Sequence, residues 1–174
     1  YGSADYYYVN KSSLPKVYGG FNTSLSWKGF DLSAIFAYSI GGYIYNRDIT
    51  MILHNGSLEG RDWSTEILRR WTPDNRYTDV PALSTTSNNW NSASTRFLQN
   101  NSYMRLKNLT LSYNLPKQWI SKLSLSSVQV YVQGDNLFTI HRNQGLDPEQ
   151  GITGITYYRY PAMRTISGGI NISF

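Results

Sequence analysis

The chain has 174 residues, a length usual for one domain, and combines 40% hydrophobic residues with only 16% charged ones. No run of about 18 apolar residues occurs, which excludes a membrane-spanning helix, and the absence of cysteine argues against a disulfide scaffold or a thiolate metal site. The formal charge of +5 comes from scattered basic residues with no run longer than Arg69-Arg70, so no nucleic-acid partner is expected.

Two long strands are predicted at residues 16–28 and 30–40, joined by a tight turn at Lys28-Gly29. Apolar and small polar residues alternate in both. In the second strand one face carries Phe30, Leu32, Ala34, Phe36, Tyr38 and Ile40. Each strand is about 11 residues long, which suits a tilted membrane-spanning strand better than an ordinary strand of five or six residues.

A long loop is predicted at residues 41–102, with one short helix inside it. The helix is expected to begin at an Asp62 cap and to run through Trp71, because Trp63, Ile67 and Trp71 recur at a spacing of four. Pro73 and the residues after it favour a turn that ends the helix.

Three further strands are predicted at residues 103–114, 127–140 and 162–174. A short link containing Pro116 joins the first two, and a long loop at residues 141–161 joins the last two. The chain stops on Phe174, in phase with the apolar face of the last strand.

These features predict an all-β fold, an antiparallel transmembrane β-barrel segment. The many Tyr, Asn, Ser, Thr and Gly residues suit a sheet with one face in lipid and the other in a wet lumen. Short turns on one side and long loops on the other are typical of outer-membrane barrels, with the loops extracellular. Closure needs at least about eight strands, so other segments must complete the barrel. The chain begins at Tyr1 without an export signal, so we expect a piece of something longer.

Arg105 and Lys107 break the pattern, because simple alternation places them on the apolar face with Leu109. A cation at the bilayer midplane costs about 2–4 kcal/mol. Either both side chains reach the lipid headgroups, or a β-bulge inverts the alternation above Leu109.

Several motifs occur in the same order along the chain from about residue 15 to its end. They are Trp27-Lys28-Gly29-Phe30-Asp31-Leu32, Arg70-Trp71-Thr72-Pro73-Asp74-Asn75, the run from Ser102 to Pro116, Asp135-Asn136-Leu137-Phe138-Thr139, Leu146-Asp147-Pro148-Glu149, Tyr160-Pro161, and Arg164-Thr165 through Phe174. Together they resemble the C-terminal end of SusC/RagA-family TonB-dependent transporters, the large outer-membrane barrels of Bacteroidetes.

The resemblance implies that the chain forms the last five strands of a 22-stranded barrel in the outer membrane of a Gram-negative bacterium. It implies active import of oligosaccharides or oligopeptides. The implied partners are the remainder of the barrel and its plug, a SusD-like surface lipoprotein, and the TonB complex, which the missing N-terminal part contacts. Lipopolysaccharide, lipid and the barrel-assembly machinery complete the expected set.

Three groups of residues are candidates for function. Aromatic residues of the loops are expected to contact the substrate or the SusD-like lipoprotein, which would act as a lid; they could also simply pack the loop. They are Trp63, Trp71, Trp90, Tyr157 and Tyr158. A membrane girdle is expected from Trp27, Phe30, Tyr113 and Phe174. The barrel-assembly signal is expected in Ile170, Ile172 and Phe174.

Catalysis, a metal site and cofactors are not expected. The two histidines, His54 and His141, are far apart in or beside loops, where we expect them to be solvated, and no local motif supplies a triad. Asp147-Pro148-Glu149 lacks the spacing of a calcium loop and predicts a turn that Asp147 initiates.

Two other classes fit parts of the sequence. A soluble secreted β-sandwich that binds carbohydrate explains the tryptophans, but not the strand length or the terminal Phe174. A small autonomous barrel would require several copies of the chain to associate.

Overall fold

The computed structural model describes residues 6–56, 58, 60–84, 86, 89–149, 151–156 and 158–174. They form two compact units. The sheet unit consists of Pro15–Gly42, Asn101–Glu149 and Tyr160–Phe174. The loop unit consists of the described residues of Tyr1–Leu14, Tyr43–Asn100 and Gln150–Arg159.

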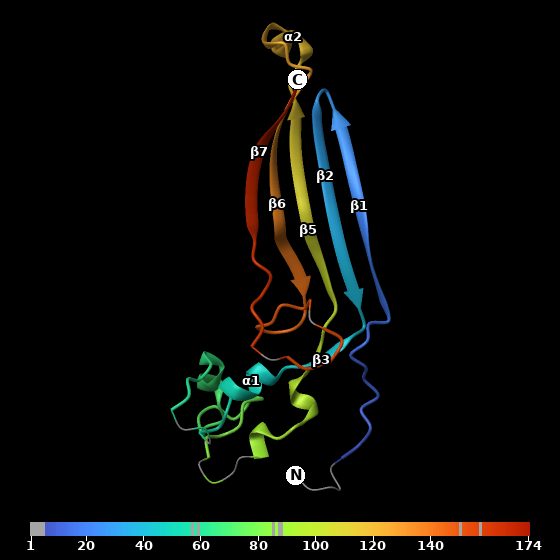
Figure 1. Cartoon of the computed structure of the whole chain (residues 1–174). Coiled ribbons are helices and arrows are strands. Elements are labelled where there is room, and N and C mark those ends of the chain that lie inside the picture. Colours follow the sequence, from blue (N-terminus) through green and yellow to red (C-terminus); the bar gives the residue numbers. More distant parts are fainter. Residues whose placement is uncertain are drawn as a thin grey trace. The chain divides into compact units, whose positions relative to one another are not determined.

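The sheet unit holds one five-stranded sheet in the order β1-β2-β5-β6-β7, in which all neighbours are antiparallel (Figure 1). Its strands are β1 (Val17–Trp27), β2 (Phe30–Ile40), β5 (Tyr103–Asn114), β6 (Ser127–His141) and β7 (Thr165–Ser173). The predicted antiparallel sheet of five strands is therefore confirmed. Sequence neighbours pair throughout, except that β2 pairs with β5 across the long loop.

The last strand begins three residues later than predicted, at Thr165 rather than at residue 162. The backbone before it is bonded to side chains instead of to a neighbouring strand. The amide of Ala162 donates to Asp147, and the carbonyl of Met163 accepts from Asn136.

The β1–β2 turn has the predicted two-residue form. Lys28 and Gly29 both have positive φ, 48° and 88°, so the turn twists with the strands that it joins. A Cβ on Gly29 would also lie 3.1 Å from the Asn114 carbonyl oxygen, which leaves little room for another residue. The link between β5 and β6 is longer and contains α2 (Lys117–Ile120) and η5 (Ser121–Leu123).

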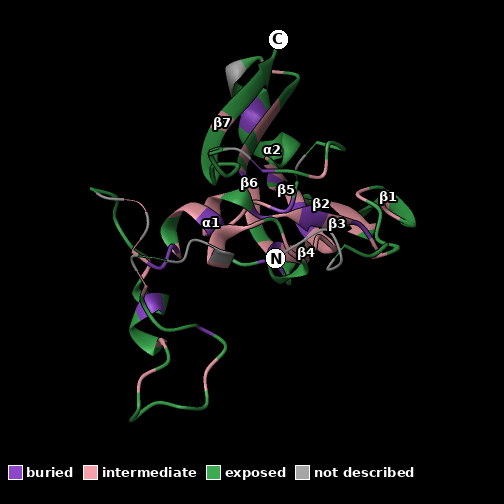
Figure 2. Ribbon diagram, turned by 90° about the horizontal axis from the view of Figure 1, so that it is seen from below, coloured by how far each residue is buried: buried purple, intermediate pink, exposed green. Residues whose placement is uncertain are grey.

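The two faces of the sheet differ in composition from edge to edge. On the apolar face one row across four strands reads Leu32, Leu111, Val132 and Gly168. On the polar face the next row reads Ser33, Thr110, Gln133 and Ser167. Many large apolar side chains are exposed, such as Ile166 (72%) and Ile170 (62%), whereas Leu106 is buried, and burial in the strands is confined to short stretches (Figure 2).

The loop unit contains short elements around a small core. Its elements are β3 (Tyr43–Tyr45), α1 (Arg47–Ile52), η2 (Thr65–Arg69), η3 (Asn89–Asn91), η4 (Thr95–Phe97) and β4 (Leu98–Asn100), with β3 paired to β4. Ile44, Val80 and Phe97 are almost fully buried, together with polar residues such as Asn46 and His54. Among the described residues no helix is long and apolar enough to cross a membrane.

The predicted helix from Asp62 to Trp71 is wrong in its bounds and in its cap. The segment forms only the 3₁₀ helix η2, and Ser64, not Asp62, accepts the capping bond from the Glu66 amide. With about three residues per turn, a spacing of four no longer keeps side chains on one stripe. Ile67 is buried, whereas Trp63 and Trp71 stay 44% and 43% exposed.

Gly20 should be sensitive to substitution because β2 lies directly against it. A Cβ on Gly20 would lie 2.8 Å from the Phe36 carbonyl oxygen, and a backbone atom cannot move aside cheaply. We expect Gly20→Ala to destabilise the β1–β2 pairing by about 1–3 kcal/mol. Gly19→Ala is the matched control, since its Cβ would meet only the end of the Tyr38 side chain, at 3.0 Å. Denaturant unfolding of the full-length protein measures the stability of both variants. Equal losses of unfolding free energy in the two would contradict the backbone clash at Gly20.

Candidate functional site: the polar face of the sheet and the loop aromatics

A β-bulge decides where the two strand cations lie. Lys107 has no partner in either neighbouring strand: pairing with β2 passes from Asn108 directly to Leu106, and pairing with β6 does the same. Arg105 consequently lies opposite Ala37 and Thr139 on the polar face. Of the two alternatives left open by the sequence, the bulge is the correct one.

On the polar face, Arg105 and Lys107 form an ion-pair cluster with Asp147 and Glu149. The Arg105 guanidinium contacts the Asp147 carboxylate, and its Nη1 lies 3.1 Å from Glu149 Oε2. Lys107 Nζ donates to Glu149 Oε1 at 2.6 Å. The side chains of Arg105 and Asp147 are only 3% and 7% exposed. We call these four residues the loop clamp, because they hold the segment after β6 against β5.

Asp147 joins three segments of the chain. Besides Arg105 on β5, its carboxylate accepts hydrogen bonds from the amides of Glu149 (2.9 Å) and Ala162 (2.7 Å). The bond from Glu149 is the turn that the sequence predicts for Asp147 as initiator. Burial alone would raise the pKa of the Asp147 carboxyl, but these two amides and the Arg105 guanidinium outweigh it and hold the pKa below its ordinary value.

Asparagines fix the rest of the loop before the clamp. Asn143 is buried and donates to the Asn101 side chain at 2.9 Å, and Asn101 donates to the Pro148 carbonyl at 2.8 Å. The His141 ring lies 3.0 Å from the Asn143 carbonyl oxygen. The loop from residue 141 to 149 is therefore bonded to the sheet unit at several points.

The lowered pKa of Asp147 predicts how acid releases the clamp. A carboxyl whose folded-state pKa lies below its unfolded value stabilises the fold above that unfolded value, and the stabilisation is lost as the pH falls through the folded pKa. We therefore expect full protection of residues 142–149 from protease between pH 7 and about pH 4, and loss only below that range. In the Asp147→Asn variant, residues 142–149 should be more accessible to protease at pH 7 than in the wild type. Their accessibility should also change less when the pH is lowered. Release of the wild-type loop near pH 6 would contradict this assignment.

The described loop aromatics, Trp63, Trp71, Trp90 and Tyr158, all belong to the loop unit. Trp63 packs against His54: its Nε1 donates to His54 Nδ1 at 3.0 Å, and the ring centroids lie 5.3 Å apart. His54 is 1% exposed, so the expectation that it is solvated is wrong. Its Nδ1 also accepts the Gly56 amide, which gives His54 a packing role.

Three of the remaining candidates differ in their surroundings. Trp90 donates its indole N–H to the Leu53 carbonyl, whereas Trp71 is 43% exposed. Tyr158 is 68% exposed, with its amide bonded to Asp48. Tyr157 lies outside the described residues.

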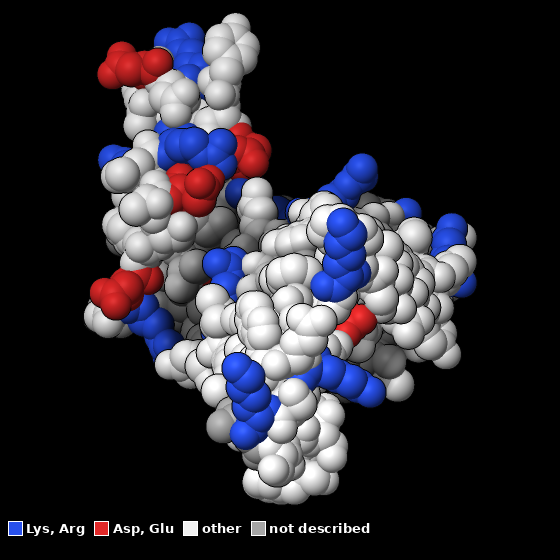
Figure 3. All heavy atoms as spheres, turned by 90° about the horizontal axis from the view of Figure 1, so that it is seen from above, with Lys and Arg blue, Asp and Glu red and all other residues white. Residues whose placement is uncertain are grey.

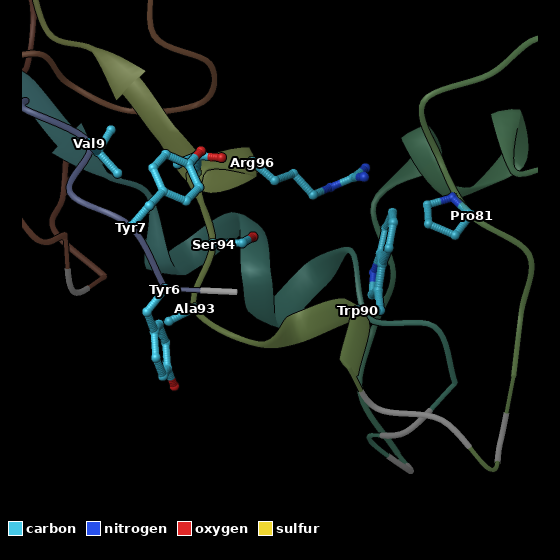
Figure 4. Close-up of a pocket in the computed structure, with 9 residues that line it drawn as sticks. Tyr6, Tyr7, Val9, Pro81, Trp90, Ala93, Ser94 and Arg96 are labelled. Atoms are coloured by element: carbon cyan, nitrogen blue, oxygen red, sulfur yellow. The ribbon is translucent and has the colours of Figure 1, made fainter. Parts of the chain in front are cut away.

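Trp90 lines a cavity of about 590 Å³ in the loop unit. Figure 4 shows Trp90 and Pro81 on one side, Tyr7 and Val9 on the other, and the Arg96 side chain reaching towards Trp90. The Arg96 guanidinium carbon lies 3.6 Å from the centroid of the Trp90 ring, a cation–π contact. The sequence indicated Trp90 but missed Arg96, because nothing in the sequence shows that it faces an aromatic ring. Among the described residues no cluster could hold a metal ion.

The predicted girdle residues lie at one end of the sheet, where the β1–β2 turn is. Phe30 and Tyr113 are cross-strand partners with ring centroids 4.4 Å apart, and Trp27 pairs with Phe30 from the other side. Phe174 follows β7 at this end and is 92% exposed. In the same strand Ile170 and Ile172 lie opposite Val130 and Val128 on the apolar face.

Comparison with known proteins shows which family this sheet and loop arrangement represents. No protein-family model matches the chain. The chain is 34% identical over 166 residues to TonB-dependent receptor P3 of Formosa agariphila, covering 89% of the chain and 16% of that receptor. It is 27% identical over 168 residues to TonB-dependent receptor SusC of Bacteroides thetaiotaomicron, covering 96% and 16%. The structure matches the RagAB peptide importer in its closed-closed state with a TM-score of 0.86 and 34% identity, over 100% of this chain and 19% of that one.

The chain is homologous to a segment of the SusC/RagA-family TonB-dependent receptors. It spans less than a fifth of the length of these relatives. TonB-dependent receptors are outer-membrane β-barrel proteins, and the family consists of transporters, not enzymes. The resemblance drawn from the motifs, the outer-membrane location and the prediction of no enzymatic activity are thereby confirmed.

Proposed function

We propose that the chain forms the last five strands of a 22-stranded outer-membrane barrel that imports nutrients, either oligosaccharides or oligopeptides. The observation that carries this proposal is the five-stranded sheet with one apolar and one polar face, in a chain homologous to TonB-dependent receptors. Lipid covers the apolar face, and the polar face lines the lumen. The short links then face the periplasm, and residues 41–102 and 141–161 lie on the extracellular side.

The strand dimensions support a place in the barrel wall. The strands of the sheet have 9 to 15 residues, and about 9–11 tilted residues cross a bilayer. Large apolar side chains are exposed at many positions of the apolar face, for example Leu25, Val132 and Ile170. In water such a face would be an aggregation surface, whereas in a bilayer it is stabilising.

A soluble β-sandwich is less well supported. That architecture needs two packed sheets of several strands. The described residues instead form one five-stranded sheet and one two-stranded sheet whose strands have only three residues.

The proposed partners follow from the family. A SusD-like surface lipoprotein would close the extracellular side, where Trp63, Trp71, Trp90, Tyr157 and Tyr158 contact it or the substrate. The remainder of the barrel, its plug, the TonB complex, lipopolysaccharide and the assembly machinery complete the set. Trp27, Phe30, Tyr113 and Phe174 would seat the barrel in the membrane, and Ile170, Ile172 and Phe174 would present the assembly signal.

Uptake by whole cells tests the proposal. Cells that lack the full-length gene should lose uptake of one class of labelled nutrient, oligosaccharides or oligopeptides, and regain it with the wild-type gene but not in a strain without TonB. Fractionation should find the full-length protein in detergent-extracted outer membranes. A protein that stays in the aqueous phase without detergent would overturn the proposal, as would unchanged uptake of both classes.

A further inference from the structure

The link between β5 and β6 is longer than joining the two strands requires. Two residues connect β1 to β2, whereas residues 115–126 separate β5 from β6 and fold into α2 and η5. The link begins and ends beside the sheet: the Leu115 amide donates to the Val128 carbonyl, and the Ser126 amide donates to the Ser173 carbonyl. Figure 1 shows α2 beyond the sheet at the end where the chain terminates. The extra residues therefore present a surface that the sheet itself does not need.

The surface of this link is basic and aromatic. Lys117 and Lys122 are its only charged residues, since no Asp or Glu occurs from Leu115 to Ser126. No described acidic side chain pairs with either lysine. Trp119 is 64% exposed, while Ile120, at 4%, anchors α2 to its surroundings. Figure 3 looks onto this end of the sheet and shows basic side chains among mostly uncharged surface.

This surface continues the end of the apolar face. The Asn114 amide donates to the Gly29 carbonyl, which places the start of the link beside the β1–β2 turn. There Trp27 is 64% exposed, and Lys28 Nζ lies 4.9 Å from the Trp27 ring centroid. This end of the sheet thus carries the three lysines Lys28, Lys117 and Lys122 together with exposed aromatic rings. Asp31 is an acidic residue nearby. Asp31 accepts hydrogen bonds from Ser26 and Asn114 on the polar face.

We propose that α2 docks on anionic phospholipid headgroups, with Trp119 at the headgroup level and Lys117 and Lys122 on the phosphates. Aromatic rings with a polar end favour this level, and each lysine near an anionic surface strengthens binding on the order of fivefold. The inference rests on the proposed function, which puts this end of the sheet at the periplasmic leaflet. Phosphatidylglycerol has the required charge.

A fluorophore at position 119 tests this in the full-length transporter. Trp119→Cys is labelled with bimane, in a background without other reactive cysteines, and reconstituted into nanodiscs of phosphatidylcholine with or without phosphatidylglycerol. We expect quenching by lipids that carry a nitroxide on the headgroup, and stronger quenching when phosphatidylglycerol is present. Adding Lys117→Gln and Lys122→Gln should remove the phosphatidylglycerol effect, whereas Lys11→Gln with Lys16→Gln should leave it. A label at Tyr77, which is fully exposed in the loop unit, serves as the control position.

Each other outcome is decisive. Quenching only by a water-soluble nitroxide would show that α2 projects into water and would overturn the inference. Quenching by neither reagent would show that another part of the protein covers α2, with the same consequence. A phosphatidylglycerol effect that survives loss of both lysines would overturn the headgroup assignment. Failure of the wild-type protein to enter nanodiscs at all would instead overturn the proposed function.

Discussion

Arg105→Ala should destabilise the full-length protein by about 3–5 kcal/mol, because it leaves the Asp147 carboxylate buried without its cation. The loop clamp would lose both of its contacts to Arg105, at Asp147 and at Glu149. We expect a lower free energy of unfolding in denaturant and faster proteolysis of residues 142–149.

The matched control is an ion pair on the surface. Arg69 pairs with Glu66 where both side chains are at least half exposed, so Arg69→Ala should change the stability by no more than about 1 kcal/mol. Combining Arg105→Ala with Asp147→Ala should cost less than the two single changes added together, since no unpaired charge remains. Equal effects of Arg105→Ala and Arg69→Ala would show that the clamp is open to water in the complete protein.

Val132→Arg should destabilise the barrel by about 2–4 kcal/mol if the apolar face meets lipid near the bilayer centre. Val132 is 47% exposed on this face, between Leu111 and Gly168. The measurement is denaturant unfolding of the full-length protein in lipid vesicles, with its yield in outer-membrane fractions as a second readout.

The adjacent residue provides the control. Gln133 lies on the polar face, and its side chain donates to Asp135 at 3.2 Å, so Gln133→Arg places the cation in water beside a carboxylate. We expect little loss of stability. A larger loss for Gln133→Arg than for Val132→Arg would show that the faces are assigned the wrong way round.

The sheet could be predicted from sequence because each long strand carries its own signal. Alternation over about 11 residues fixes which side chains share a face, and Lys28-Gly29 fixes the register of the first pair. Pairing of β2 with β5 carries no local signal. It is shown by the structure, in which the two strands are antiparallel neighbours.

The loop clamp could not be predicted from alternation, because a bulge is a property of two paired strands. Lys107 is an extra residue only by comparison with β2, where the consecutive residues Ile35 and Phe36 pair with Asn108 and Leu106. One signal was available: two cations spaced by two residues in a strand, and two acids with the same spacing at Asp147 and Glu149. Matching those spacings would have suggested the pairing.

The loop unit was the least predictable part. Its strands have three residues and α1 has six, too few for any periodicity to be measured. The Trp63–Ile67–Trp71 spacing suggested an α-helix, but only Ile67 of the three is buried, and the segment forms a shorter 3₁₀ helix. His54 is held by bonds from Trp63 and Gly56 that depend on the folded loop.

The unequal connections have a consequence for the order of folding. The β1–β2 hairpin closes over two residues and forms within microseconds in typical hairpins. Pairing β2 with β5 must first close the loop at residues 41–102, which adds about 3 kcal/mol of closure entropy, roughly 0.6 kcal/mol for each doubling of length. We therefore expect the pairing of β2 with β5 to form late. Until it forms, the unpaired edges of β2 and β5 are the places where this sheet can pair with a wrong strand.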